Sequence, residues 1–227
     1  MNDIRNHQRV NDILLGPLER PVLKWLALHL PAWVTPDGCT FAGIIGALAA
    51  MAGYALSCFD RNFLWLASLG FALNWLGDSL DGTLARHRNI ERPVIGFFID
   101  HTTDAVSQVV IFLGLGLSPY VSFPVAALAL VAYMLLSVLV YIRTYATGEF
   151  TISYGKFGPT EIRVLAIGLN TVMYFAGIRE IRLAAGAAGS LALNPYDLVI
   201  AGLTVILLLF FTITTIRETI RMRKTNR

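Results

Sequence analysis

Long apolar segments, separated by short polar or proline-containing connections, constrain this chain more than any other feature. A helix needs about 20 mostly apolar residues to cross a bilayer, and several segments reach that length. Of the 227 residues, 56% are hydrophobic and 15% are charged, well below the roughly 25% charged residues of soluble domains. The sequence therefore predicts an all-α integral membrane protein. We expect six transmembrane helices, at about 38–59, 62–86, 94–117, 121–145, 157–178 and 196–216.

Residues 8–31 have the pattern of an amphipathic helix. Four apolar side chains recur at helical spacing, opposite two basic ones: Val22, Trp25, Leu26 and Leu30 against Arg20 and Lys24. The pattern predicts an interfacial helix in the plane of the headgroups, and a short soluble helix packed on the protein is the alternative. Pro17 and Pro21 should break or bend it. Residues 183–195 are too short to span, so we expect a loop or interfacial turn there.

The distribution of basic residues predicts the orientation in the membrane. Fifteen of the 18 Lys and Arg residues fall on one side of the predicted spans, and cytoplasmic loops are the ones enriched in these residues. Both termini should therefore be cytoplasmic, and no nucleic-acid partner is needed to explain the net charge of +3. We divide the chain into a cytoplasmic amphipathic arm (1–37), a transmembrane catalytic domain (38–216) and a basic cytoplasmic tail (217–227).

A dense group of charges interrupts the apolar pattern between Asp78 and Asp104. The stretch reads DSLDGTLARHRNIERPVIGFFIDHTTD and contains four aspartates. Ionisable residues are costly inside a bilayer and usually functional there. At about 100° per residue, one face of the second segment carries Asp78, Asp81, Gly82, Ala85 and Arg86. Spacing by four places Gly96, Asp100 and Asp104 on one stripe of the third segment. If the two helices face each other, four carboxylates meet.

Four carboxylates in an apolar bundle would repel one another unless a cation lay among them. Oxygen ligands suit Mg²⁺, Mn²⁺ or Ca²⁺ better than zinc. Four are enough for two metal ions, an arrangement that holds a phosphoryl group during in-line displacement. Gly82 and Ala85 leave room for a nucleoside diphosphate on the same face. A cation transporter is the competing class, but Asp81 lies five residues before Arg86, near the cytoplasmic end, whereas transport sites usually lie near the midplane.

The pattern D-x-x-D-G-x-x-A-R, followed by G-x-x-x-D-x-x-x-D, resembles the signature of the CDP-alcohol phosphotransferase family of integral membrane enzymes. Nine residues separate Arg86 from Gly96, where eight are usual in the family. The resemblance implies a homodimeric, Mg²⁺- or Mn²⁺-dependent enzyme of phospholipid synthesis. It would transfer a phosphatidyl group from CDP-diacylglycerol to a polar alcohol and release CMP.

The same resemblance implies roles for individual residues. Asp78, Asp81 and Asp100 would be metal ligands, and Asp104 both a ligand and the general base for the acceptor hydroxyl. The CDP moiety would be bordered by Asp78, Gly82, Ala85 and Arg86, together with Asp37 and Thr40 from a segment similar to T-P-N-x-x-T. Asp37 could equally be a helix N-cap.

Basic residues around the fourth connection are the candidates for acceptor or lipid-phosphate binding. They are Arg143, Lys156 and Arg163, with Glu161 beside them. The three basic residues could equally reflect the general excess of Lys and Arg on the cytoplasmic side. Glu161 could equally interact favourably with a helix N-terminus.

His101 and the tetrapeptide G-P-T-E at 158–161 instead resemble the aminoalcohol branch of the family. That branch moves phosphocholine or phosphoethanolamine from a CDP-aminoalcohol to a lipid hydroxyl. The short chain favours the phosphatidyl reaction, and a lone helical histidine is more often structural, so the donor stays open at this stage.

Overall fold

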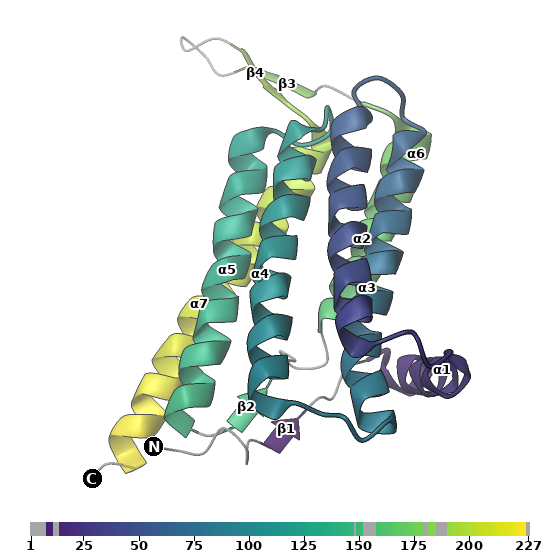
Figure 1. The fold of residues 1–227 in the computed structure, drawn as a ribbon. Helices are drawn as coiled ribbons and strands as arrows, with labels where there is room; N and C mark the ends of the chain where they lie inside the picture. The colour runs from purple at the N-terminus through teal and green to yellow at the C-terminus, as the bar shows by residue number, and fades with distance from the viewer. Residues whose placement is uncertain are drawn as a thin grey trace.

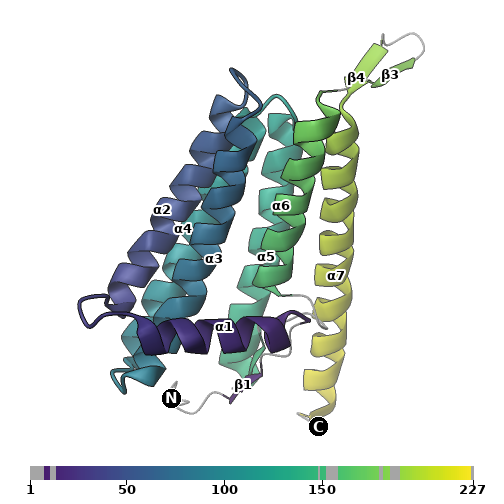
Figure 2. The same cartoon turned by 90° about the vertical axis from the view of Figure 1, so that its right-hand side faces the viewer.

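The computed structural model describes residues 8–10, 14–147, 149–151, 158–178, 181–184 and 190–225, and every structural statement below concerns these residues. Six helices run side by side as a bundle, while α1 lies across one end of it, called here the α1 end (Figures 1 and 2). The helices are α1 (Gly16–His29), α2 (Pro36–Leu56), α3 (Phe63–His87), α4 (Pro93–Leu117), α5 (Phe123–Thr147), α6 (Pro159–Ala176) and α7 (Pro195–Thr225).

The helix boundaries follow local signals in the sequence. Four helices begin at a proline, whose fixed φ suits the first helical turn and whose missing N–H is not needed there: α2, α4, α6 and α7. The side chain of Thr35 caps α2 by accepting a hydrogen bond from the Gly38 backbone N–H at 3.1 Å. Thr35, and not Asp37, is therefore the N-cap.

The predicted apolar segments all form helices of this bundle. Three are long and apolar enough, by length and composition, to cross a membrane: Pro36–Leu56, Phe123–Ala146 and Pro195–Lys224. A count of six spans stays a prediction. Helix α7 continues to Thr225, well beyond the predicted end near 216, so most of the predicted basic tail is helical.

Helix α1 is continuous through Pro17 and Pro21, so the predicted break does not occur. The predicted apolar stripe is divided: Leu26 and Leu30 pack partly against the bundle, whereas Val22 and Trp25 face outward. Leu23 and Ala27 are buried against α3, whereas Val22 is 48% and Trp25 58% exposed. The helix has two apolar faces, and sequence spacing alone could not tell which one packs on the bundle.

Small residues allow α2 and α3 to approach at backbone distance. A Cβ on Gly46 would lie 2.4 Å from the Asn74 backbone nitrogen, and one on Gly77 would lie 2.4 Å from that of Gly43. On the other side of α2, a Cβ on Gly114 of α4 would lie 2.5 Å from Cα of Met51. Close small-residue packing of this kind is typical of membrane helices. Helix α2 therefore lies between α3 and α4 and holds both close to itself (Figure 1).

Two short sheets complete the fold. At the α1 end, β1 (Gln8–Val10) pairs in parallel with β2 (Glu149–Thr151). At the opposite end, β3 (Ile181–Ala184) pairs with β4 (Ser190–Leu193) as an antiparallel hairpin (Figure 1). The segment predicted as a loop or interfacial turn is therefore partly strand, and the helical fold class holds for the bundle itself.

Candidate active site

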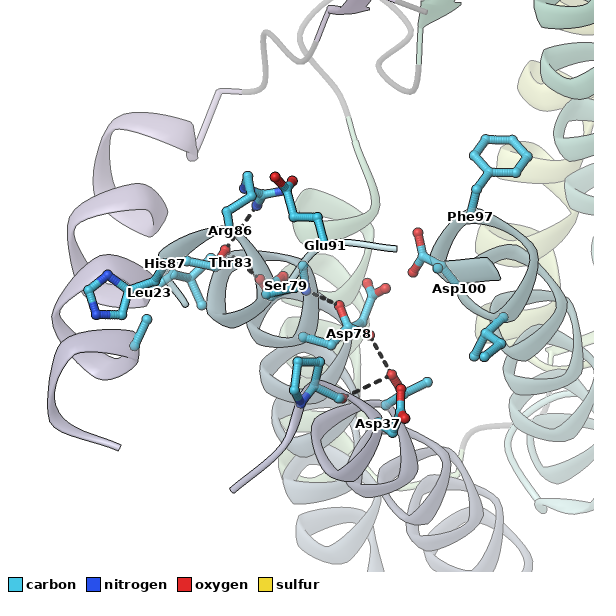
Figure 3. A pocket seen from close by; sticks show the side chains of 18 of the residues that line it. Leu23, Asp37, Asp78, Ser79, Thr83, Arg86, His87, Glu91, Phe97 and Asp100 are labelled. Atoms are coloured by element: carbon cyan, nitrogen blue, oxygen red, sulfur yellow. Dashed lines mark hydrogen bonds between the residues drawn. The ribbon is translucent and has the colours of Figure 1, made fainter. Parts of the chain in front are cut away.

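A cleft of about 990 Å³ opens at the α1 end of the bundle. Its walls come from α1, α2, α3, α4 and α6, and from the connection between α3 and α4. In Figure 3, Asp100 and Phe97 of α4 face Asp78 of α3 across this space, and Leu23 of α1 lies on the far side of α3 from them. A smaller cavity lies against Asp78 and Asp81 and is also lined by Asp104.

Three of the four predicted aspartates come together. Asp78 on α3, and Asp100 and Asp104 one helical turn apart on α4, each offer a carboxylate oxygen, and these atoms all lie within 4.8 Å of one another. The two predicted stripes therefore face each other. All three residues are half-buried, so their mutual repulsion is only partly screened by solvent. Hard oxygen ligands in this number and spacing fit a divalent cation such as Mg²⁺ or Mn²⁺.

Asp81 lines the same cleft but turns toward α2. One of its oxygens accepts a hydrogen bond from the Thr40 hydroxyl at 2.7 Å, and the other accepts from the Gly82 backbone N–H at 2.5 Å. Asp81 therefore stands beside the three-carboxylate group, with its orientation set by Thr40.

Arg163 of α6 provides a positive charge next to the carboxylates. Its guanidinium donates to Asp78 at 2.8 Å and, through Nε, to the Asn74 side chain at 2.9 Å. Asn74 in turn donates to the Gly43 carbonyl at 3.0 Å, where α2 and α3 touch. Asn74 was not among the predicted site residues, although a polar residue one turn before Asp78 in an apolar segment is a signal that could have found it.

The residues predicted to border the CDP moiety all line the cleft: Asp37, Thr40, Asp78, Gly82, Ala85 and Arg86. A Cβ on Gly96 would meet nothing within 4 Å, and one on Gly82 would meet the Arg86 guanidinium at 3.4 Å. Asp37 forms an ion pair with Arg92 from the α3–α4 connection. The arrangement leaves space for a ligand along the face of α3 that carries Gly82.

The predicted acceptor residues do not all lie at the cleft. Arg163 lines the cleft, whereas Arg143 forms an ion pair with Glu218 of α7 at 3.3 Å. Glu161 is 4% exposed and accepts hydrogen bonds from the backbone N–H groups of Leu15 and Gly158, each at 2.8 Å. Among the described residues, neither Arg143 nor Glu161 belongs to the cleft lining. Lys156 lies outside the described residues.

His101 also lines the cleft, packed among aromatic rings. Its ring stacks on Phe97 with centroids 4.0 Å apart and lies 5.2 Å from the ring of Tyr141. Its Nδ1 is 3.3 Å from a carboxylate oxygen of Asp100. His101 therefore lies beside Asp100 at the wall of the cleft.

Comparisons with known proteins agree with the geometry. The family described as CDP-alcohol phosphatidyltransferase matches residues 33–213. The chain is 29% identical to cholinephosphotransferase 1 of Gallus gallus over 72% of this chain and 50% of that protein. It is 39% identical to a phosphatidylinositol phosphate synthase of Cutibacterium acnes over 39% of this chain and 40% of that protein. The matched part thus spans about half, or less, of these two relatives. An archaetidylinositol phosphate synthase of Methanothermobacter thermautotrophicus is 31% identical over 60% of this chain and 66% of that protein.

Proposed function

We propose, because the chain belongs to the CDP-alcohol phosphatidyltransferase family, that it transfers a substituted phosphate group from a CDP-linked donor to a hydroxyl and releases CMP. The observation that carries this proposal is the group of Asp78, Asp100 and Asp104, with oxygens within 4.8 Å, beside a cleft of about 990 Å³. The cleft has room for a nucleotide donor. Asp78 and Asp100 line its wall, and Asp104 lines the adjoining smaller cavity.

The residues around the cleft would have different roles in a displacement at phosphorus. Asp37, Thr40, Gly82, Ala85 and Arg86 would hold the CDP moiety along α2 and α3. The acceptor oxygen would attack the phosphorus next to the alcohol of the donor while the bond from that phosphorus to the CMP oxygen breaks. Asp104 would take the proton from the acceptor hydroxyl, as a general base in reach of the reacting oxygen.

Asp78, Asp100 and Asp104, joined by Asp81, would hold one or two divalent cations, Mg²⁺ or Mn²⁺. Such a cation supplies positive charge that stabilises the charge developing on the phosphoryl oxygens. Arg163 would keep Asp78 in place through their 2.8 Å contact, and Thr40 would do the same for Asp81. The chain itself therefore orients Asp78 and Asp81.

Arg163 is the residue of the cleft that we propose for binding the acceptor. It is a partly buried cation beside the reacting groups, suited to a phosphate on the acceptor or on a lipid. Lys156, Arg143 and Glu161 belong to the same proposed acceptor region by sequence. Of these, Arg143 and Glu161 are engaged by Glu218 and Leu15, so a direct contact with acceptor would require them to change partners.

We further propose that the protein is integral to the membrane with the α1 end in the cytoplasm. Several helices are apolar enough to span, and the basic residues gather at the α1 end by sequence. Apolar side chains on the outer face of α1, such as Leu18, Val22 and Trp25, would then lie in the interface. A homodimer remains part of the proposal on family grounds.

The preferred reaction is transfer of a phosphatidyl group from CDP-diacylglycerol to a polar alcohol. Two relatives are named as inositol phosphate synthases, and the archaeal one has more of its length matched than the chicken protein, 66% against 50%. The second candidate is transfer of phosphocholine or phosphoethanolamine to a lipid hydroxyl. His101 beside Asp100, and the likeness to cholinephosphotransferase 1 over 72% of the chain, favour it.

A two-way substrate screen tests the proposal and decides between the candidates. Purified protein in bilayers with Mg²⁺ or Mn²⁺ would receive CDP-diacylglycerol with polar alcohols, including inositol phosphate, or CDP-choline and CDP-ethanolamine with diacylglycerol. We expect CMP release with the first donor. CMP release only with the second would establish the aminoalcohol reaction, and cation flux without any CMP would favour a transporter.

A further inference from the structure

The C-terminal end of α1 is attached to α3 through one arginine. Arg88, which ends α3, donates through Nη2 to the carbonyls of Pro31 at 3.0 Å and Leu30 at 3.2 Å. Through Nη1 it donates to the carbonyls of Val34 and Ala32. These carbonyls belong to the C-cap of α1 and to the α1–α2 link rather than to the helix itself, so this one side chain satisfies them and ties the link to α3.

The N-terminal end of α1 is attached to α6. One oxygen of Glu161 accepts from the Leu15 backbone N–H at 2.8 Å, and the other accepts from the Gly158 backbone N–H at 2.8 Å. Next to it, the Thr160 hydroxyl donates to Glu19 of α1 at 2.8 Å. Glu161 thus serves both helices, and its position 146 residues from Leu15 in the sequence hides this role from any local pattern.

Between these attachments, α1 closes one side of the cleft. Leu23 and Ala27 pack with Leu80, Leu84 and the buried Cys39, and both α1 residues also line the cleft. The helix therefore bridges α3 and α6 on the outside, at the end where Arg163 and Asp78 join the same two helices on the inside. Figure 2 shows α1 lying across this end of the bundle.

We propose that α1 is a brace that fixes one wall of the cleft, and that Arg88 and Glu161 are positioning residues for binding of the CDP-linked donor. The substrate in this statement rests on the proposed function, whereas the brace itself does not. Release of either end lets the α1 wall move while the aspartates stay in place on α3 and α4. Donor binding should weaken more than the chemical step.

The native cysteines report directly on the brace. Of the two cysteines, Cys39 is buried beneath α1 and Cys58 is exposed, so a Cys58→Ser parent leaves Cys39 alone to react with N-ethylmaleimide. Glu161→Gln keeps the side-chain size but replaces one acceptor oxygen by a donor, and Arg88→Gln removes the guanidinium. Each should raise the Cys39 labelling rate about tenfold or more, since hydrogen bonds to charged groups account for at least that ratio.

Two controls separate the brace from a general loss of stability. Asp197 is also buried and accepts from two backbone N–H groups, those of Ser122 and Asn194, but at the opposite end of the bundle. Asp197→Asn should lower thermal stability without changing Cys39 labelling at temperatures below unfolding. Arg223→Gln makes the same charge change as Arg88→Gln on the exposed end of α7 and should leave labelling unchanged.

Steady-state kinetics distinguish a role in donor binding from a role in stability alone. Arg88→Gln and Glu161→Gln should raise the donor KM about tenfold with kcat within about twofold, the pattern of lost binding without lost chemistry. Arg88→Lys, which keeps one donor group, should recover part of the KM. Unchanged Cys39 labelling in both Gln variants, or a fall in kcat at constant donor KM, would overturn the proposal. If the parent releases no CMP, the proposed function fails, and labelling still decides whether α1 is a brace.

Discussion

The bundle contains one region where helix backbones touch, between α2 and α3, and one helix, α7, whose apolar stretch is mostly exposed. Between α2 and α3, a Cβ on Gly46 or Gly77 would fall 2.4 Å from a backbone nitrogen of the other helix, whereas a Cβ on Gly202 of α7 would meet nothing within 4 Å. Of the apolar stretch of α7, 11% is buried, against 39% for α2. The acidic group is thus carried next to the region with the least freedom to move.

The difference shows which side chains must keep fixed positions. Carboxylates that share a cation must keep their separations, and backbones in contact hold them better than long side chains can. Asp78 follows directly after Gly77, the residue that touches α2, and Asn74 one turn earlier joins α2 to Arg163. Helix α7 carries no member of the acidic group, and most of its apolar stretch is exposed.

Removal of divalent cations should have the largest effect. In the tightly packed region, Asp78, Asp100 and Asp104 without a cation would repel one another and no longer stabilise a phosphoryl group. Chelation should abolish CMP release, and added Mg²⁺ or Mn²⁺ should restore it. Asp100→Asn should raise the metal concentration required for half-maximal activity and for protection against thermal unfolding. Full activity after chelation would remove the cation from the mechanism.

Replacement of the proposed base should come next. Asp104→Asn keeps the side-chain size but cannot accept the proton from the acceptor, so kcat should fall about 10²- to 10⁴-fold. Donor binding, measured by equilibrium titration with a labelled CDP-linked lipid, should change by less than about fivefold if Asp104 acts on chemistry. Near-normal turnover would exclude Asp104 as the base.

The matched control for Asp104 lies in the other region. Asp197 of α7 is also a buried carboxylate, 6% exposed, but it serves only the backbone of the connections at the opposite end. Asp197→Asn should lower stability by about 1–3 kcal/mol and leave kcat unaltered. A large loss of kcat in both variants would show that the two regions are coupled.

A Gly→Ala substitution should change the free energy of unfolding differently in the two regions. Gly77→Ala would force a Cβ to within 2.4 Å of the Gly43 backbone nitrogen, and overpacking of this kind costs about 1–3 kcal/mol or more. Gly202→Ala has open space and better helix propensity, so it should be neutral or stabilising by up to about 1 kcal/mol. Thermal unfolding and CMP release would be measured for both. Equal effects would mean that the α2–α3 contact is not tighter than α7.

The sequence predicted the elements well because their signals are local. Apolar length and the prolines at helix starts defined the bundle, and the spacing of Asp78, Asp100 and Asp104 was enough to bring them to one place. The projection places Asp81 about 60° around the helix from Asp78. In the structure it lines the same cleft while its side chain reaches Thr40 of α2, and its role as a metal ligand stays a prediction.

What sequence spacing could not supply are the contacts between distant segments. The packed face of α1 depends on Leu80 and Leu84 of α3. The hairpin β3–β4 is a local pairing by contrast, but it forms in a stretch that reads as apolar and featureless. Glu161 was predicted for the acceptor, while the structure pairs it with Leu15. Such partners lie outside any window of sequence spacing.

The smallest expected effect concerns Arg143, and it tests whether the acceptor region reaches the α5–α7 side. Arg143 is paired with Glu218 at 3.3 Å, and Glu218 is also 3.9 Å from Arg221. Because a partly exposed ion pair contributes about 0–1 kcal/mol, Arg143→Gln should lower the free energy of unfolding by no more than that. In Arg143→Gln the acceptor KM should change by less than about twofold. Arg163→Gln, beside Asp78 in the cleft, should raise the acceptor KM about tenfold or more, because the loss of a charge-assisted hydrogen bond to the acceptor accounts for at least that ratio. If Arg143→Gln raised the acceptor KM as much as Arg163→Gln, Arg143 would have to leave Glu218 during binding, and the loosely packed region would take a direct part in the reaction.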